Sequence, residues 1–472
     1  MPNIMQTGKS GLMTSKAAIG TTGHNISNAN TEGFSRQRVD QATTTPHPRA
    51  GEKRVIGTGT KIDRVRRIND EYLEKQIRSS HRLLNHFEEK DMMLKQVEDI
   101  FNEMNGDGLN RLMSRYFNEF RKLANEPDNE AVRQSVREAT QSMVNDFHRI
   151  RNEVVSTSRH IDSRLEGYIS ELNNYADQMR TLNRRIREVE LGNGSPNDLY
   201  DRRDEILKKI SSYLDITTHK DNHGNVNIDI QGVGPLVTGD AFEQFSTERS
   251  PMDDQGKMDG SVDIRTSGSV RGIVTHNIKG GKLGALLEVR DQAITQVLNR
   301  MDELAYNIAE STNAIHEQGF TRDGVQGVKF FKQLDGKNRA AELLELSDEV
   351  KYNSNAIATA AAPDAPGDNR IALLVSGLQH HRIMNDGKVT ADDFYNSIVS
   401  DVGVSSSRNR ENLGQQKEIQ TQLGKMRDSI SGVSLDEETT NLMQYQHIYG
   451  ASAKVIQVAD EMLKTVLELK RN

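Results

Sequence analysis

The sequence predicts a mainly α-helical, multi-domain protein in which a β insertion interrupts a long antiparallel helical bundle. Of its 472 residues, 27% are charged and only 5% are aromatic, a composition typical of long helices. Apolar residues recur at helical spacing through most of the chain. A glycine-richer stretch near the middle alternates apolar and polar residues instead. Both halves of the chain are therefore expected to supply helices, with a small outer β-rich domain between them.

The N-terminal part carries apolar residues at seven-residue intervals, at Met5, Leu12, Ile19 and Ile26. This spacing predicts a helix with one narrow apolar stripe. The residues between them are mostly small, so a second helix can approach closely. An Asn-rich stretch follows and ends the helix in a turn. Residues 39–62 are punctuated by Thr and Pro and are predicted to be extended.

The middle of the chain is dominated by one periodic run at 132–189 without proline. A helix of about 60 residues would be roughly 90 Å long. If helices of both halves pack side by side, the termini meet at one end and the β insertion projects from the other. Further helices are predicted at 69–104, 109–123, 197–214, 282–316, 368–379 and 392–430, with strands within 216–281.

We expect the chain to divide into seven parts: 1–65, N-terminal axial helix and extended segment; 66–195, first half of the helical domain; 196–281, β-rich outer domain; 282–318, returning helix; 319–391, mixed loop and helix; 392–431, last helix of the helical domain; and 432–472, C-terminal axial helix.

Residues 432–472 carry the clearest apolar stripe of the chain. Ser434 and Glu437, three residues apart, are predicted to form a capping box at the helix start. Lys470 and Arg471 suit the negative C-terminal end of the helix dipole. A helix of about 37 residues would span roughly 55 Å. The stripe consists of Leu435, Leu442, Tyr449, Ile456 and Leu463, together with Tyr445, Ser452, Ala459 and Val466.

This C-terminal stripe needs a partner. The N-terminal stripe has only four large apolar residues and is too small to cover it. We therefore expect both chain ends to be frayed in the free monomer and to fold when copies of the chain stack. Gly450 lies beside Tyr449, and a glycine inside a helix costs about 1 kcal/mol relative to alanine. Its position indicates close approach of another helix.

The composition argues against several classes of protein. There is no cysteine, which excludes disulfides, thiolate chemistry and cysteine-type zinc sites. Against 61 basic residues stand 68 acidic ones, so no basic excess favours nucleic acid or an anionic membrane. No run of 18 apolar residues predicts a membrane span. The first residues also lack the charged and apolar regions of a cleaved secretory signal.

The sequence offers only weak candidates for catalytic or ligand-binding residues. Residues 383–394 superficially suggest a calcium loop. If Gly387 is aligned with the glycine that such a loop requires, Arg382 falls at the first ligand position, so a turn before a helix is the better interpretation. Residues 221–225 indicate a hairpin turn. His380 and His381 are adjacent, and adjacent residues on a helix point about 100° apart. We predict no catalytic, cofactor-binding or metal-binding residue and no cofactor.

Two short basic clusters, Arg64/Arg66/Arg67 and Arg184/Arg185/Arg187, are interleaved with acids. They are interpreted as solvated helical faces, with a subunit contact as the alternative.

Four stretches resemble the bacterial flagellar rod, hook and hook-associated protein family. NISNANTEGFSRQ at 25–37 is similar to the N-terminal signature that the whole family shares. Three further stretches resemble the members that join the hook to the filament. These are NDLYDRRDE at 197–205, the series Asn313, His316, Gly319, Gly324, Gly327, Phe330 and Phe331, and GVSLDEE at 432–438 with Tyr445-Gln446 and ASAK at 451–454.

The resemblance implies a structural, non-enzymatic subunit of the hook–filament junction, with its terminal helices in the inner tube of the flagellum. It implies secretion through the flagellar type III channel without a cleaved signal, so the protein would be extracellular. The implied partners are further copies of the chain, the hook protein, hook-associated protein 3 and a cytosolic export chaperone at the C-terminal helix. Ser27 and Glu32 depart from the signature, and the region after Phe331 is short for the family. The expected assembly interface is Leu12, Ile19, Ile26, Asn28, Gly33, Phe34, Leu435, Leu442, Tyr445, Tyr449, Gly450, Ile456, Ala459, Leu463 and Val466.

Three alternatives differ in testable ways. Hook-associated protein 3 or a distal rod protein would share the N-terminal signature but not NDLYDRRDE. A cytoplasmic coiled-coil scaffold would continue its heptads without the Asn-rich turn or the β insertion. A wall hydrolase would need paired carboxylates in a cleft, whereas Asp253-Asp254 and Asp392-Asp393 are adjacent pairs in loop-like settings.

Overall fold

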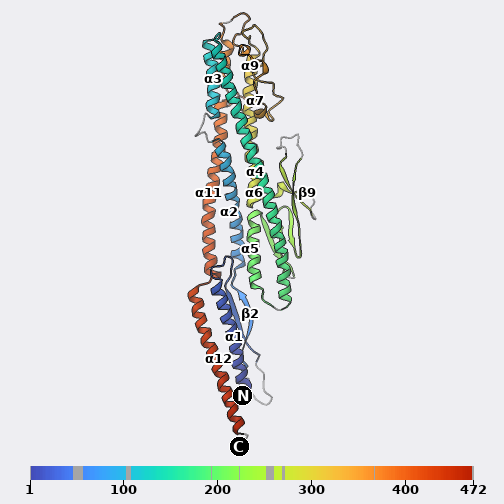
Figure 1. Ribbon diagram of the computed structural model, residues 1–472, viewed down its shortest axis with the longest axis vertical. Coiled ribbons are helices and arrows are strands. Elements are labelled where there is room, and N and C mark those ends of the chain that lie inside the picture. Colours follow the sequence, from blue (N-terminus) through green and yellow to red (C-terminus); the bar gives the residue numbers. More distant parts are fainter. Residues whose placement is uncertain are drawn as a thin grey trace.

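The computed structural model describes residues 2–45, 57–101, 108–192, 194–222, 224–250, 260–267, 272–365 and 367–469. The molecule is a long rod of helices with both chain ends at the same end of the rod (Figure 1). The predicted class, mainly α with a β insertion, is confirmed. Lys470, Arg471, His223 and Asp253-Asp254, on which parts of the sequence interpretation rest, lie outside the described residues. None of the helices in the described ranges has the length and apolar character needed to cross a membrane.

The lower end of the rod is a helical hairpin, here called the terminal hairpin, of α1 (Pro2–Ser27) and α12 (Leu435–Leu469). The two helices run antiparallel, because Gly8 lies against Ile456 and Asn25 against Glu438. A two-stranded antiparallel ribbon, β1 (Gln37–Thr43) and β2 (Thr60–Arg67), lies along α1. The basic cluster Arg64/Arg66/Arg67 is therefore on a strand, and its prediction as a helical face is wrong.

The body of the rod is the expected bundle of helices from both halves of the chain (Figure 1). The longest, α4, has 62 residues, or about 93 Å at 1.5 Å per residue. Its buried side chains recur every three or four residues along its whole length, which explains why its apolar period predicted it correctly. The other helices of the body pack along α2 or α4. The body comprises α2 (Glu71–Ile100), α3 (Leu109–Asn125), α4 (Glu130–Leu191), α5 (Asn197–Tyr213), α6 (Gly281–Glu288), α7 (Thr295–His316) and α11 (Ala391–Ser431).

The returning helix contains one irregularity that its periodicity did not predict. A π-helical turn, η2 (Val289–Ile294), joins α6 to α7. Within it, the buried Arg290 donates to Asp162 Oδ1 and to Val262 O, each at 2.7 Å. The turn therefore joins α4 to the β insertion through one guanidinium.

The β insertion consists of two small antiparallel sheets. Contrary to the prediction, they lie on the flank of α4 and do not project from the far end of the rod (Figure 1). The reason is that four strands of the insertion, β5 to β8, contact the long helix directly. One sheet has the order β3-β4-β5-β6 and the other β7-β8-β9. The strands are β3 (Ile216–Lys220), β4 (Val226–Ile230), β5 (Gly234–Thr238), β6 (Ala241–Phe242), β7 (Phe245–Arg249), β8 (Val262–Thr266) and β9 (Gly272–Ile273), followed by the 3-10 turn η1 (Thr275–Asn277).

The far end of the rod is closed by the segment between α7 and α11. Asn313 anchors this segment, because its Oδ1 accepts from the amides of Phe330 (3.0 Å) and Phe331 (2.8 Å). Gly319 permits a close approach there, since a Cβ at this position would lie 2.9 Å from both Ala358 and Ile371. The short elements are α8 (Ala340–Leu343), α9 (Asp348–Tyr352), η3 (Ser354–Ala356) and α10 (Arg370–Gly377).

Candidate assembly interface

The two helices of the terminal hairpin touch through small residues. A Cβ on Gly8 would lie 2.7 Å from Ile456 Cγ1, and one on Gly11 would lie 2.7 Å from Ser452 Oγ. Ala18 is also buried, whereas Leu12, Ile19 and Ile26 are only half-buried. The closest contact of α1 with α12 is therefore made by small side chains beside the predicted apolar stripe.

The predicted stripe of α12 faces α1 along most of its length. Ala459 is only 3% exposed, and Leu442, Tyr445, Ile456 and Leu463 are half-buried. Three members do not follow this pattern, because Leu435, Tyr449 and Val466 are exposed. Gly450 is also exposed, and no atom of the described chain lies within 4 Å of the place where its Cβ would be.

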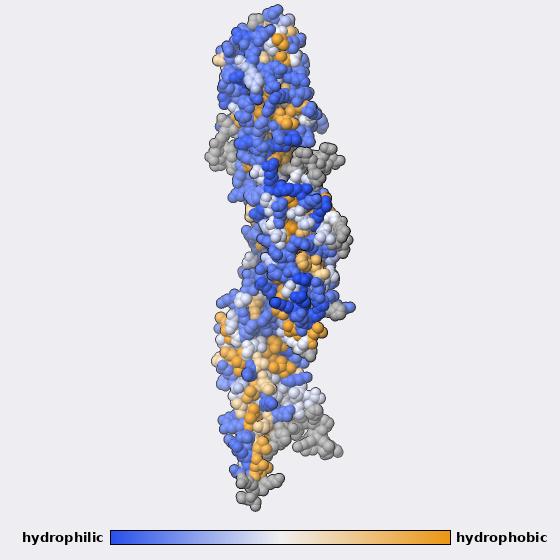
Figure 2. Space-filling model, turned by 45° about the vertical axis from the view of Figure 1, so that its right-hand side comes forward, coloured by the Kyte–Doolittle hydropathy of each residue, from blue (hydrophilic) through white to orange (hydrophobic). Residues whose placement is uncertain are grey.

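A second apolar face of α12 was missed by the sequence interpretation. It consists of side chains between 41% and 46% exposed, and apolar side chains (orange) run along the lower part of the rod in Figure 2. The signal was available, because Ile448, Val455 and Met462 also recur every seven residues. We call this set the open face of α12: Ile448, Val455, Val458 and Met462.

The terminal hairpin is joined to the ribbon by a buried polar cluster around Asn25. Its amide nitrogen donates to Gln37 O (2.9 Å) and to Glu438 Oε2 (3.0 Å), and its Oδ1 accepts from Gln37 N (2.9 Å). Glu438 is 2% exposed and pairs with Arg36 Nε at 2.8 Å. Arg36 also pairs with Glu437 at 2.7 Å. One Asn side chain thus ties together α1, β1 and α12.

Glu437 has a different role from the predicted one. Its backbone N–H does donate to Ser434 Oγ, at 3.4 Å, as a helix cap requires. Its side chain pairs with Arg36, so half of the predicted capping box forms and the other half serves the hairpin.

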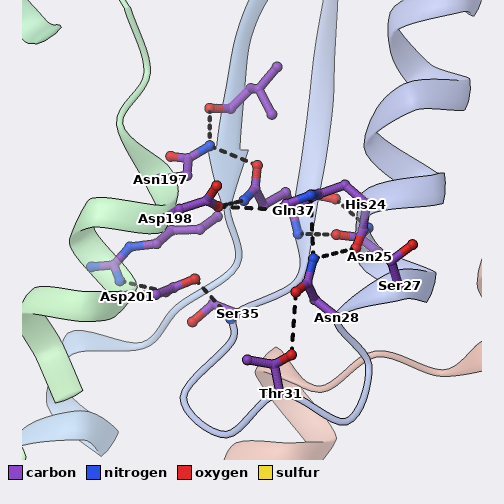
Figure 3. Close-up of polar contacts among 12 residues, drawn as sticks. His24, Asn25, Ser27, Asn28, Thr31, Ser35, Gln37, Asn197, Asp198 and Asp201 are labelled. Atoms are coloured by element: carbon purple, nitrogen blue, oxygen red, sulfur yellow. Dashed lines mark hydrogen bonds and ion pairs between the residues drawn. The ribbon is translucent and has the colours of Figure 1, made fainter.

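A second polar cluster joins the ribbon to α5 (Figure 3). Asn197 Nδ2 donates to Val65 O at 2.9 Å and to Gln37 Oε1 at 3.2 Å. Gln37 Nε2 donates to Asp198 Oδ1 at 2.8 Å, and His24 Nε2 lies 3.3 Å from the same oxygen. Two of the four stretches that carry the family resemblance, 25–37 and 197–205, therefore meet in space, although about 160 residues separate them along the chain.

Asp201 lies at the centre of this contact. Its carboxylate accepts from Ser35 N at 3.1 Å and from Arg67 Nη1 at 2.9 Å. Burial raises the pKa of Asp201, and these two donors partly oppose the rise. Arg67 also pairs with Asp204 at 2.7 Å, and the two carboxylates hold its pKa above the ordinary value despite its burial. We call the two clusters together the anchor, because they fix the terminal hairpin to the body.

Asn28, Gly33 and Phe34, predicted at the assembly interface, lie in the loop that leads to the anchor. Asn28 Nδ2 donates to His24 O at 3.0 Å, and Phe34 packs edge-on against the His24 ring. Gly33 has φ +84°, a left-handed conformation that favours glycine. Its carbonyl accepts from Arg427 on α11 at 3.2 Å.

Two of the stretches weighed for chemistry contain turns, whereas Asp392 and Asp393, predicted in a loop-like setting, lie in the first turn of α11. Met384 and Val389 bridge a turn just before α11, and Asp221 and Asn225 close the β3–β4 hairpin. Across the described ranges, no three His, Asp or Glu side chains gather as a metal site would require. Burial raises the pKa of Asp392, which the sequence did not indicate.

Three family models match this chain. A model described as flagella basal body rod protein matches residues 5–34, and one described as flagellar basal body rod FlgEFG protein C-terminal matches 427–469. These two ranges cover most of the terminal hairpin, so the hairpin is the part of the chain that resembles flagellar basal body rod proteins. The third model, flagellar hook-associated protein FlgK helical domain, matches 94–331.

Relatives and a solved structure agree with the third model. Flagellar hook-associated protein 1 of Bacillus subtilis is 28% identical, over 98% of this chain and 97% of that protein. The protein of the same name from Salmonella typhimurium is 24% identical, over 100% of both chains. The flagellar hook junction protein FlgK of Burkholderia pseudomallei has a similar fold, with a TM-score of 0.67 and 16% identity over 75% of this chain and 100% of that one.

The chain belongs to the FlgK family of flagellar hook-associated proteins. The predicted function, a structural subunit of the junction between hook and filament, is confirmed. The alternatives, another axial protein or a cytoplasmic coiled-coil scaffold, are not favoured.

Proposed function

We propose that the chain builds the hook–filament junction by assembling through its terminal hairpin with the hairpins of neighbouring subunits. The open face of α12 is the observation that supports this proposal. Its apolar side chains lie on the side of α12 that α1 leaves exposed. Burying an exposed apolar side chain stabilises an assembly by about 1.5–3 kcal/mol. Gly450, which has open space around it within its own chain, adds room for a neighbouring helix.

The proposed neighbours are further copies of the chain within the junction, with the hook protein on one side and hook-associated protein 3 on the other. The body, from 66 to 195 with 282–318 and 392–431, would form the shell outside the hairpins. The β insertion would lie further out on the flank. The role is structural and not enzymatic.

The open face also supports a role for a cytosolic export chaperone at α12. Apolar surface of this extent promotes aggregation before assembly, so a partner that covers it until secretion would protect the chain. We propose that the chain then leaves through the flagellar export channel without a cleaved signal and acts outside the cell.

A deletion strain tests the role. Without this chain, hooks should remain intact while flagellin is lost into the medium, and the unchanged chain should restore filaments. Normal filaments in the deletion strain would contradict the junction role.

Complementing that strain with variants tests the open face. Val455→Glu places a charge on this face and should be secreted without restoring filaments. Lys454→Glu changes an exposed neighbour outside the open face and should restore them. Motility and shed flagellin are the readouts, and full motility with Val455→Glu would show that the open face does not mediate assembly.

A further inference from the structure

A groove lies between α2 and strand β3 of the β insertion, next to the anchor, because Arg67 and Asp204 line one of its hollows. It consists of two adjoining hollows of about 270 Å³ and 330 Å³. Both hollows are lined by Lys75 and Arg78 of α2 and by Thr218 of β3. All five residues of β3, Ile216–Lys220, contribute to the lining, so the groove follows the whole strand.

The strand that borders the groove is a free sheet edge. β3 is the outermost strand in the order β3-β4-β5-β6. Gln231 N donates to Asp215 O at 3.1 Å, and Asp221 N donates to Asn225 O at 3.0 Å, so the backbone groups of 215 and 221 face β4 or its flanks. In an antiparallel ladder alternate residues face the partner strand. The backbone groups of 216, 218 and 220 therefore point away from β4. Among the described residues, none forms a backbone hydrogen bond with these outward groups.

The groove also carries excess positive charge. Its carboxylates already have cationic partners, as in the pairs Asp204–Arg67 and Asp215–Arg82, and Glu74–Arg427. Glu71 pairs with Lys220. In contrast, within the ranges that the structure describes, three cations of the groove have no carboxylate within 4 Å: Lys75, Arg78 and Arg203.

Arg203 is the most unusual of the three cations. It is only 4% exposed, and among the described residues its hydrogen-bond acceptor is Gly224 O, at 3.4 Å. Its Nε is buried without a partner. The guanidinium stacks on the Tyr200 ring, 5.0 Å from the centroid. Burial lowers the pKa of Arg203 although Asp204 and Glu190 attract it from a distance. A buried cation without a close counter-charge is costly, and a negative group in the adjoining groove would lower that cost.

We propose that this groove binds an extended acidic segment of a neighbouring flagellar subunit, which adds to β3 as a fifth strand. The free edge supplies main-chain hydrogen bonds, as in other cases of β-strand addition. Lys75 and Arg78 are one helical turn apart and lie opposite the strand, so acidic side chains at alternate positions can reach them. Five strand residues span about 17 Å, which fits an extended segment better than a single small anion. The inference uses the family assignment but does not depend on the proposed assembly through the terminal hairpin.

The probe is a capped, fluorescein-labelled peptide of alternating glutamate and threonine, titrated into the full chain and followed by anisotropy. The matched peptide has lysine in place of glutamate and should not bind. The variant Lys75→Ala/Arg78→Ala should weaken binding roughly tenfold or more. Lys95→Ala, an exposed cation of α2 outside the groove, should leave binding unchanged.

Thr218→Pro distinguishes strand addition from simple charge attraction. Proline removes the outward N–H of residue 218 and leaves the ladder with β4 intact, so the peptide should no longer bind although circular dichroism is unchanged. Bound peptide should also slow amide exchange at Ile216, Thr218 and Lys220. The proposal is wrong if the acidic peptide does not bind. It is equally wrong if the Thr218→Pro variant binds the peptide normally. Displacement of the peptide by millimolar inorganic phosphate, with no protection of these amides by the peptide, would also contradict strand addition.

Discussion

Gly8 and Gly20 occupy the same helix, yet their surroundings are opposite. A Cβ on Gly8 would collide with Ile456 Cγ1 at 2.7 Å, whereas nothing lies within 4 Å of a Cβ on Gly20. The helix propensity of glycine is equally poor at both positions. Packing therefore requires glycine at position 8, whereas Gly20 only weakens the helix.

Gly8→Ala should destabilise the terminal hairpin by about 1–3 kcal/mol, because Ile456 and the neighbouring backbone of α12 must move. Gly20→Ala should instead stabilise α1 by up to about 1 kcal/mol. Hydrogen exchange of α1 amides in the two variants measures both changes. Equal shifts in the same direction would contradict the close contact at Gly8.

Gly450→Leu should not destabilise the isolated chain and should stabilise α12 by up to about 1 kcal/mol, because open space surrounds this position within the chain. If a neighbouring helix packs there in the flagellum, the variant should be exported but fail to assemble. Unfolding of the purified chain and motility of the complemented strain separate these effects. Gly424→Leu, at another open helical glycine, is the matched control, and normal motility with Gly450→Leu would make Gly450 a tolerated surface residue.

At the scale of elements, α7 holds the far end of the rod through a neutral histidine. His316 is fully buried, its Nδ1 lies 2.7 Å from Val328 O, and its Nε2 accepts from Ala358 N at 2.8 Å. With Nε2 as acceptor, Nδ1–H is the donor, so the ring carries one proton. Burial lowers the pKa of His316 to about 4.

This pKa predicts a loss of stability in mild acid. Because the folded pKa lies below the unfolded value of about 6.5, the unfolded chain binds more protons between these two pH values, and stability falls as the pH drops through that window. The contribution of His316 should decrease by about 2 kcal/mol between pH 7 and pH 5. Melting curves at both pH values measure it. His316→Gln should reduce the pH dependence, while the exposed His276→Gln should not.

At the scale of the whole molecule, the terminal hairpin and the body differ in how well they are covered. The body has a continuous core that runs from α2 through α4 to α11. The hairpin contributes few buried apolar side chains, among them Ala18 and Ala459. It is connected to the body mainly by the polar anchor around Asn25 and Asp201. Elements with few buried apolar contacts open first.

We therefore expect amides of α1 and α12 to exchange rapidly in the free monomer and to become protected when the chain assembles. Amides of α4 should be protected in both states. Hydrogen exchange of the monodisperse chain, before and after assembly, measures the difference. Sharp amide resonances and strong protection at both termini of the monomer would contradict the prediction.

Several features could be predicted from the sequence because they depend on local periodicity. The apolar periods at 132–189 and 432–472 predict helices directly, and the structure has helices at Glu130–Leu191 and Leu435–Leu469. The turn at 221–225 joins two strands as its composition indicated. The π turn at Val289–Ile294 could not be predicted, because its buried Arg290 meets Asp162 from a distant helix.

The candidate interface was predicted in part for the same reason. The heptad stripe of α12 is visible in the sequence, and most of it faces α1. The sequence did not show that Gly8 and Gly11, and not Leu12, make the closest contact. It also did not show that Arg67 is a partner of Asp201 on a strand, because that pairing needs β2 and α5 to be side by side.

By itself, the sequence determined the helical character of this protein, its β insertion and its family, since helix periods and motif spacings are properties of short stretches of chain. The tertiary structure alone decided which side of α12 remains open, where the β insertion lies and how the two signature motifs meet. These depend on contacts between residues far apart along the chain, such as Asn25 with Glu438 and Gln37 with Asp198, and no local pattern specifies such contacts.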